Sequence, residues 1–294
     1  MKTRARSVGR TLRARLIEAE SSAEHFLLKT GDHWNGHVTW SAMVKLAGAH
    51  GVNRVAKRPL SVAGLSMPIG TGRAILVNDS DTPVRQRFTL AHEIAHLFLD
   101  EETTREVWLR TPRGQNHQAH RTLETFCDDL ASRILMPRAW LERDLKGKSP
   151  MPSLLLKLAD QYGVSRQAFC IRAINFLGGA YHVAEWCKTT DSHSQSSIRR
   201  TWQAAARGMS RLMPEETTMH SPVGHLLQEC LADHTASYSG ELVREHKSES
   251  VEMRACLLQK GPHPTMIAVT RRFKARQKAK QLQEQPYAVS THPP

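Results

Sequence analysis

The sequence predicts an α+β fold, and three observations on its 294 residues support that prediction. An apolar helical segment at 85–100, RQRFTLAHEIAHLFLD, follows two short strand-like segments. Two shorter helical segments at 154–178 have the spacing of a helix-turn-helix. Within 198–294, helical and β-branched segments are mixed, which indicates a small C-terminal α+β module.

The composition indicates a globular chain with a strong basic excess. The formal net charge is +13 and 40% of the residues are hydrophobic. Such an excess favours a nucleic-acid or acidic partner about as well as it favours a merely solvated basic surface. The five cysteines are odd in number and form no CxxC pair, so the pattern predicts a reducing cytoplasm and no disulfide framework. No run of about 18 apolar residues occurs, so we expect no membrane span.

The first 80 residues are predicted to form two helices and two strands. Residues 3–20 alternate arginine with apolar residues, which is typical of an amphipathic basic helix with a solvated face. A second helix is expected at 39–49, closed by Gly51. The short apolar segments 59–65 and 74–78 are predicted to be strands.

The next helix, which begins near Pro83, carries the main functional signal. It is apolar nearly all round, as expected of a core helix, apart from His92, Glu93 and His96 in the pattern HExxH. Residues four apart lie one turn apart on the same helical face, so the two imidazoles can bind one metal ion. Glu93 beside them is then placed to act as general base toward a water on the metal. In a chain with 16 histidines the pattern arises by chance roughly one time in twenty, so its context decides.

A third ligand must come from outside this helix. The extended pattern HExxHxxGxxH is not present, because Leu99 and Glu102 occupy its glycine and last histidine positions. Residues 100–118 are polar and predicted to be a loop that forms one wall of a cleft. Residues 121–135 regain helical periodicity and end at the Met-Pro pair 136–137.

Glu124 in this later helix is the preferred third ligand. Asp128 follows on the same face and is placed to orient a metal-binding histidine by accepting its second ring N–H. The alternative is that both acids form only the solvated face of an amphipathic helix. His117 and His120 are rival ligands, since imidazole also binds zinc well. They and the arginines of 105–121 are also the candidates for an oxyanion-stabilising group.

These motifs resemble the ImmA/IrrE family of metallopeptidases over roughly residues 59–178. RQRFTLAHEIAHLFLD matches the family's RFTLAHElgH helix, and ETFCDDLASRILMP matches its ExxANxFAxxLLMP helix. The chain departs from the family pattern at three positions. Cys127, Asp128 and Leu130 stand where the pattern has Ala, Asn and Phe. These departures keep the size or polarity of their positions and leave the metal assignment intact.

The resemblance implies a minimal zincin-like domain, with a small sheet and active-site helices. By position it implies metal binding by His92, His96 and Glu124, with Glu93 as the catalytic residue. The metal is expected to be zinc, with manganese as an alternative, because two histidines and one glutamate discriminate weakly between them. The implied substrate is a helix-turn-helix transcriptional repressor cut at one site in a stress or mobile-element response.

The helical hairpin at 154–178 motivates a different function, that of a DNA-binding regulator with the peptidase fold kept as a sensor or scaffold. Ser165 is the expected N-cap of its second helix. Arg166, Gln167 and Arg172 are the candidate DNA contacts. The alternative is that the hairpin only buttresses the peptidase domain.

The remainder is predicted to be a separate module that could sense a ligand and gate the site. A polar linker is expected at 188–197, because KTTDSHSQSS has turn-type composition. Helices are expected at 198–212 and 222–231, strands at 250–259 and 265–273, and a disordered tail after the basic segment Arg271–Lys280. The predicted division is a zincin-like domain at 1–147, a helix-turn-helix-like segment at 148–187 and a C-terminal module at 198–294.

Overall fold

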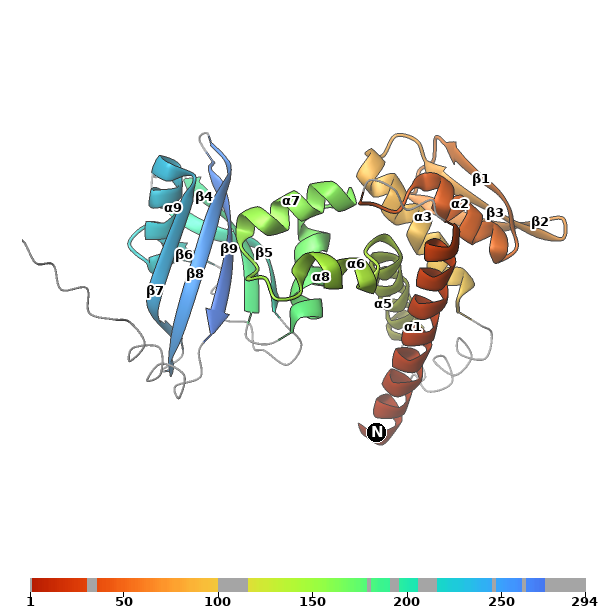
Figure 1. Cartoon of the computed structure of the whole chain (residues 1–294), viewed down its shortest axis with the longest axis horizontal. Coiled ribbons are helices and arrows are strands. Elements are labelled where there is room, and N and C mark those ends of the chain that lie inside the picture. Colours follow the sequence, from red (N-terminus) through yellow and green to blue (C-terminus); the bar gives the residue numbers. More distant parts are fainter. Residues whose placement is uncertain are drawn as a thin grey trace, which may run out of the picture. The chain divides into compact units, whose positions relative to one another are not determined.

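The computed structural model of the chain forms two compact units (Figure 1). One unit combines residues 1–146 with 157–172, and the other combines 147–156 with 173–294. The structure describes residues 2–30, 36–99, 116–178, 181–190, 196–205, 216–244, 247–260 and 263–272. The division into a peptidase domain, a helical segment and a C-terminal module at the predicted boundaries stays a prediction.

The first unit combines a three-stranded sheet with helices. The sheet has the order β1-β3-β2, with β1 parallel and β2 antiparallel to β3. Helix α1 packs on α5, α2 packs on β1 and α3, and α3 packs on β2, β3 and α5 (Figure 1). The elements are α1 (Lys2–Thr30), α2 (Trp40–Ala49), β1 (Val52–Arg58), β2 (Gly64–Ile69), β3 (Gly72–Asn78), α3 (Pro83–Leu97), α5 (Asn116–Leu135) and α6 (Arg138–Leu145).

Helix α3 is the predicted core helix, and its sequence explains where it begins. The Thr82 side chain accepts a hydrogen bond from the Arg85 N–H, and Pro83 occupies the first turn. The Gln86 side chain is buried and donates to the backbone carbonyls of Asp79 and Asp81, which ties the start of α3 to the end of β3. The apolar side of α3 is fully buried at Leu90, Ala91, Ile94 and Ala95. Burial of this side fixes which face of α3 carries the polar residues.

The two helices predicted at 154–178 are present as α7 (Pro152–Tyr162) and α8 (Arg166–Leu177), while their arrangement as a helix-turn-helix hairpin stays a prediction. The Ser165 hydroxyl accepts a hydrogen bond from the Ala168 N–H, as an N-cap does. The turn is held against α3 by Arg87, whose guanidinium donates to the carbonyls of Gly163 at 2.7 Å and Val38 at 2.7 Å. Gly163 has φ +60°, and a Cβ there would lie 2.1 Å from Arg87 Nη1, so this position requires glycine.

The second unit contains a six-stranded antiparallel sheet in the order β6-β5-β4-β9-β8-β7. Helix α9 packs on this sheet, and its Leu226, Leu227 and Cys230 share a buried core with Trp186 and Met266 of the strands. The elements are β4 (Tyr181–Thr190), β5 (Ser196–Ala205), β6 (Glu216–Thr218), α9 (Pro222–Asp233), β7 (Thr235–Arg244), β8 (Lys247–Gln259) and β9 (Thr265–Arg272).

Three local predictions are wrong. The strand predicted at 59–65 is wrong for residues 59–63, which connect β1 to β2. The preceding strand, β1, is so polar (VNRVAKR) that apolar periodicity does not find it. The helix predicted at 198–212 is β5 as far as Ala205, because pairing with β4 overrides the helix propensity of its alanines, arginines and glutamine. The linker predicted at 188–197 has paired strand residues at both ends, so β4 and β5 belong to one sheet.

The other predicted elements are confirmed, apart from those outside the described residues. The helices at 3–20, 39–49, 121–135 and 222–231 fall within α1, α2, α5 and α9, and the strands at 74–78, 250–259 and 265–273 fall in β3, β8 and β9. The loop expected at 100–118 lies outside the described residues up to 115, and its last residues begin α5. The tail and most of the basic segment Arg271–Lys280 also lie outside them.

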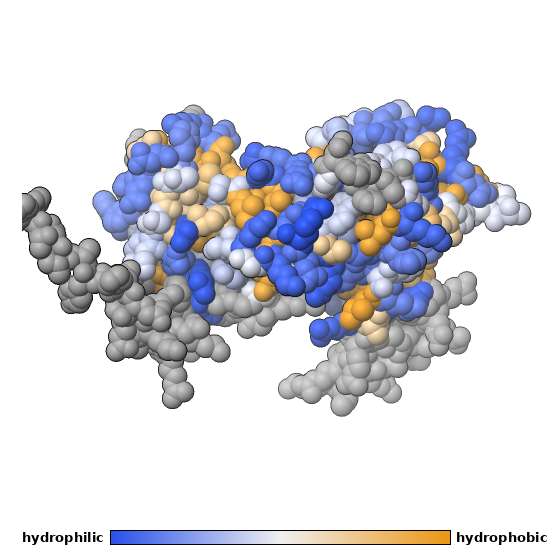
Figure 2. Space-filling view, viewed as in Figure 1, coloured by the Kyte–Doolittle hydropathy of each residue, from blue (hydrophilic) through white to orange (hydrophobic). Residues whose placement is uncertain are grey.

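Within the described part of the chain, no helix combines the length and the apolar character needed to cross a membrane. Figure 2 shows hydrophilic side chains over much of one face, with smaller groups of hydrophobic side chains between them.

His182 makes the second unit sensitive to acid. The side chain is completely buried in β4, its Nε2–H donates to Gln203 Oε1 at 2.9 Å, and burial lowers its pKa to about 4. A lowered folded-state pKa means that the unfolded chain takes up the proton first. The contribution of His182 to the free energy of unfolding is therefore fully present above pH 6.5. It is lost as the pH falls toward 4, and the loss is about 3 kcal/mol in all.

We expect this loss in urea unfolding of the second unit measured between pH 7 and 4. His182→Gln, which keeps a donor toward Gln203 without a titrating ring, should lose less stability over the same range. Equal losses in the two proteins would contradict the role of His182.

Candidate metal centre

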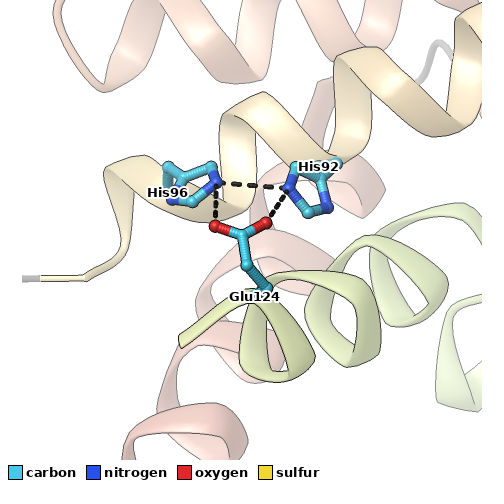
Figure 3. Close-up of side chains that lie close together, drawn as sticks. All are labelled: His92, His96 and Glu124. Atoms are coloured by element: carbon cyan, nitrogen blue, oxygen red, sulfur yellow. Dashed lines mark hydrogen bonds and ion pairs between the residues drawn. The ribbon is translucent and has the colours of Figure 1, made fainter. Parts of the chain in front are cut away.

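Helices α3 and α5 bring three candidate ligands to one point. His92 and His96 lie one turn apart on α3, and Glu124 reaches them from α5 (Figure 3). His92 Nε2 lies 3.2 Å from His96 Nε2 and 3.2 Å from Glu124 Oε2, while His96 Nε2 lies 3.8 Å from Glu124 Oε1. One ligand atom from each residue falls within 4.8 Å of the others.

The donor set fits a divalent metal ion. Two nitrogens bound to one tetrahedral zinc at about 2.0–2.1 Å lie roughly 3.3 Å apart, close to the separation of the two Nε2 atoms. Two imidazoles and one carboxylate leave a coordination position free, which is the pattern of catalytic zinc sites. The arrangement also explains why three partly buried polar groups face one another in this part of the structure.

The second ring nitrogen of His92 is bound by a carboxylate. His92 Nδ1 lies 3.0 Å from Asp128 Oδ1, one turn beyond Glu124 on α5. This hydrogen bond raises the pKa of His92, against the effect of its burial. A hydrogen bond from Nδ1–H directs the Nε2 lone pair toward the other ligands.

His96 is in a different environment. Burial lowers the pKa of His96, and the positive charges of His92 and Arg73 lower it further. Its Nδ1 lies 3.4 Å from Cys127 Sγ. The thiol of Cys127 is fully buried, and burial raises its pKa far above the ordinary range, so it stays protonated at neutral pH.

Glu93 faces the sheet beside the ligands. Burial raises the pKa of this carboxyl, and the charge of Glu124 raises it further. β2 approaches here closely at Gly64: a Cβ on Gly64 would lie 2.4 Å from Thr89 Cγ2 and 3.6 Å from Glu93 Oε1. A side chain at position 64 would therefore clash with Thr89, one turn before Glu93 on α3, while its Cβ would make only an ordinary contact with Glu93.

The rival ligands lie further out. His120 Nε2 lies 3.7 Å from Glu124 Oε1, but its side chain is exposed and it does not complete the three-ligand group among the described residues. His117 is exposed at the start of α5. The candidate oxyanion-stabilising arginines before residue 116 lie outside the described residues, and Arg121 is exposed on α5.

The candidate DNA contacts separate into two groups. Arg166 and Gln167 are exposed at the start of α8. The prediction that Arg172 faces DNA is wrong in this structure, because its side chain is only 9% exposed and donates to Glu20 Oε1 at 2.8 Å. It also donates to the Met136 carbonyl, which makes it a packing residue between helices.

The sequence alone did not indicate that two residues near the site, Cys127 and Arg73, contribute to it. Cys127 was considered only for its size, because no sequence pattern shows that its sulfur meets His96. Arg73 acts on His96 from β3, and this depends on the strand register, which the sequence alone does not provide.

Comparisons with known proteins agree with this geometry. Residues 49–173 match the family described as IrrE N-terminal-like domain, a peptidase family. The chain is 34% identical over 93 residues to the radiation response metalloprotease IrrE of Deinococcus radiodurans and 33% identical over 93 residues to that of Deinococcus deserti. Each match covers 31% of this chain, and it covers 27% and 32% of the two relatives, so the chain spans about a third or less of their lengths.

A solved structure shows a similar fold. A Mycobacterium tuberculosis transcriptional regulator matches with a TM-score of 0.53, over 87% of this chain and 76% of its own, at 13% identity. At that identity the likeness concerns the fold alone. The match to the peptidase domain and the two similar metalloproteases carry the assignment. Residues 49–173 therefore form a domain that matches the IrrE N-terminal-like peptidase family, which supports the predicted resemblance to the ImmA/IrrE metallopeptidases.

Proposed function

We propose that the chain is a metal-dependent endopeptidase that hydrolyses a peptide bond in a protein substrate. The observation that carries the proposal is the meeting of His92, His96 and Glu124 at one point, with Glu93 next to them in the sequence. A binding module or scaffold has no need for a partly buried carboxyl beside a three-ligand group. We propose zinc as the native metal, with manganese as the alternative.

When bound, the metal would lower the pKa of water and polarise the substrate carbonyl. The residues of the chain supply the remaining chemistry. Glu93 accepts a proton on its carboxylate as the water attacks and then delivers it to the leaving amine. Its raised pKa suits this double role, because the carboxylate becomes a better base toward the water and its protonated form then serves as the acid toward the amine. Asp128 holds the His92 ring in one orientation.

The proposed substrate is a helix-turn-helix transcriptional repressor, cleaved at one site in a stress or mobile-element response in the cytoplasm. The names of the two similar proteins, radiation response metalloproteases, support a stress-related role. The basic excess of the chain, +13, supports an acidic or DNA-associated partner.

The proposal predicts metal-dependent cleavage of such a repressor, best taken from a neighbouring gene. The purified chain with zinc should cut it into two fragments, detected by gel electrophoresis and mass spectrometry, and a chelator should stop the reaction. His92→Ala should abolish cleavage by removing a ligand, whereas His225→Ala, at an exposed position of α9, should leave it unchanged. Cleavage that persists in the presence of the chelator and in His92→Ala would show that this site does not catalyse the reaction.

The second candidate is a DNA-binding regulator that keeps the peptidase fold as a scaffold. The observation that favours it is the pair of short helices α7 and α8, with Arg166 and Gln167 exposed at the start of α8. The fold likeness to a transcriptional regulator is compatible with it. Strongly salt-dependent binding to duplex DNA, together with full function in cells for His92→Ala, would favour this candidate over the peptidase.

A further inference from the structure

One face of α5 supplies a candidate metal ligand and both partners of the two histidines. Glu124, Cys127 and Asp128 are spaced i, i+3 and i+4, so their side chains leave the helix on the same side. Glu124 meets the two Nε2 atoms, while Cys127 and Asp128 each meet an Nδ1 atom on the far side of a ring. Each histidine ring thus has a partner at its Nδ1 atom, a carboxylate for His92 and a sulfur for His96.

The position of the sulfur determines what it can do. Cys127 Sγ lies 3.4 Å from His96 Nδ1, within the range of a hydrogen bond to sulfur, and it faces away from Nε2. The sulfur is therefore on the wrong side of the ring to share a metal with Nε2. A ring that donates Nδ1–H to an acceptor keeps the Nε2 lone pair free for a metal.

We infer that Cys127 is a positioning residue, whose sulfur accepts the Nδ1–H of His96 and thereby holds the Nε2 lone pair toward the metal position. The inference deepens the proposed function and rests on its metal site. A thiol is a weak acceptor and carries no charge here, so its contribution is smaller than that of Asp128. The burial of Cys127 removes competing water from the contact, which keeps this weak acceptor effective.

Metal affinity of the full chain tests the inference without any peptide substrate. Metal-free protein is titrated with Co²⁺ against a competing chelator. We expect Cys127→Ala to weaken binding about tenfold, at the low end of what loss of such a partner costs. Cys127→Ser, which keeps an acceptor, should lose clearly less. Cys170→Ala removes another fully buried thiol, on α8, and should bind as the native chain does.

The Nδ1–H group of His96 gives a second readout that needs no peptide substrate. In NMR spectra of the zinc-loaded chain, where Nε2 of His96 would bind the metal, the Nδ1–H proton of His96 should exchange slowly with water, and Cys127→Ala should speed this exchange. Cys127→Val, which also removes the acceptor but fills more of the space, serves if the alanine variant does not fold. A native chain that binds no Co²⁺ would refute the metal site itself, which separates failure of the proposed function from failure of the role of Cys127.

Two results would overturn the inference. One is equal metal affinity and equal exchange of the His96 Nδ1–H proton in the native chain and Cys127→Ala. The other is an intense sulfur-to-cobalt charge-transfer band in the native chain that Cys127→Ala lacks, because that band would make the sulfur itself a ligand.

Discussion

Glu93→Gln should lower the rate of peptide-bond cleavage by about 10²–10⁴-fold, the usual contribution of a general base, while metal affinity stays near that of the native chain. The amide has nearly the shape of the carboxylate but does not accept the proton. Glu93 is absent from the three-ligand group of the described residues, so its replacement leaves all three metal contacts in place. Single-turnover cleavage with saturating zinc, combined with metal titration of the same preparation, measures both quantities.

Glu124→Ala provides the contrast, because it should lose metal and cleavage together. The difference between the two variants separates the chemical step from assembly of the site. A Glu93→Gln variant that cleaves as fast as the native chain would contradict the role of Glu93 as general base. A Glu93→Gln chain without metal would instead show that this carboxyl is part of the metal site.

Glu20→Ala should destabilise the first unit by about 3–5 kcal/mol, because it leaves one buried and one largely buried guanidinium group without their shared carboxylate. Glu20 on α1 pairs with Arg133 on α5 and Arg172 on α8. The Glu20 side chain is only 11% exposed, so water compensates poorly for its loss. Asp129 remains beside Arg133 at 3.1 Å and offsets part of the effect there. Urea unfolding followed by circular dichroism gives the free energy.

Glu18 on the same helix provides a matched control. It pairs with Arg15 at 3.0 Å, but its side chain is 70% exposed, so Glu18→Ala should change stability by less than about 1 kcal/mol. Similar losses for Glu18→Ala and Glu20→Ala would mean that helix propensity or the net charge of α1, rather than the buried network, determines the effect.

The sequence predicted the α+β class and the main elements around the site for physical reasons. HEIAH lies on a helix whose other positions are apolar, and the Thr-Pro start of that helix has a local cap. The candidate ligand Glu124 lies on a strongly amphipathic helix, which periodicity identifies well. The break between α7 and α8 at Gly163 was predictable because Gly-Val-Ser is a local signal for the end of one helix and the start of the next.

What the sequence did not predict depends on contacts between distant segments. β1 and β5 are strands because of their neighbours: β1 is rich in charged residues, and β5 carries alanines and arginines typical of helices. The pairing of Arg172 with Glu20, 152 positions away in the chain, removed it from the surface where helical spacing placed it. The contact of Cys127 with His96 likewise depends on how α3 and α5 dock, which no local pattern reports.

The division of the candidate ligands between α3 and α5 has a thermodynamic consequence. Neither helix alone holds all three, so an unfolded chain would bind the metal far more weakly than the folded one. By mass action, a free metal concentration 100 times the dissociation constant would add about 2.7 kcal/mol to the stability of the first unit. Chelation should therefore lower its thermal midpoint, and a cell's supply of free metal would influence how long the folded chain persists as well as how fast it cleaves.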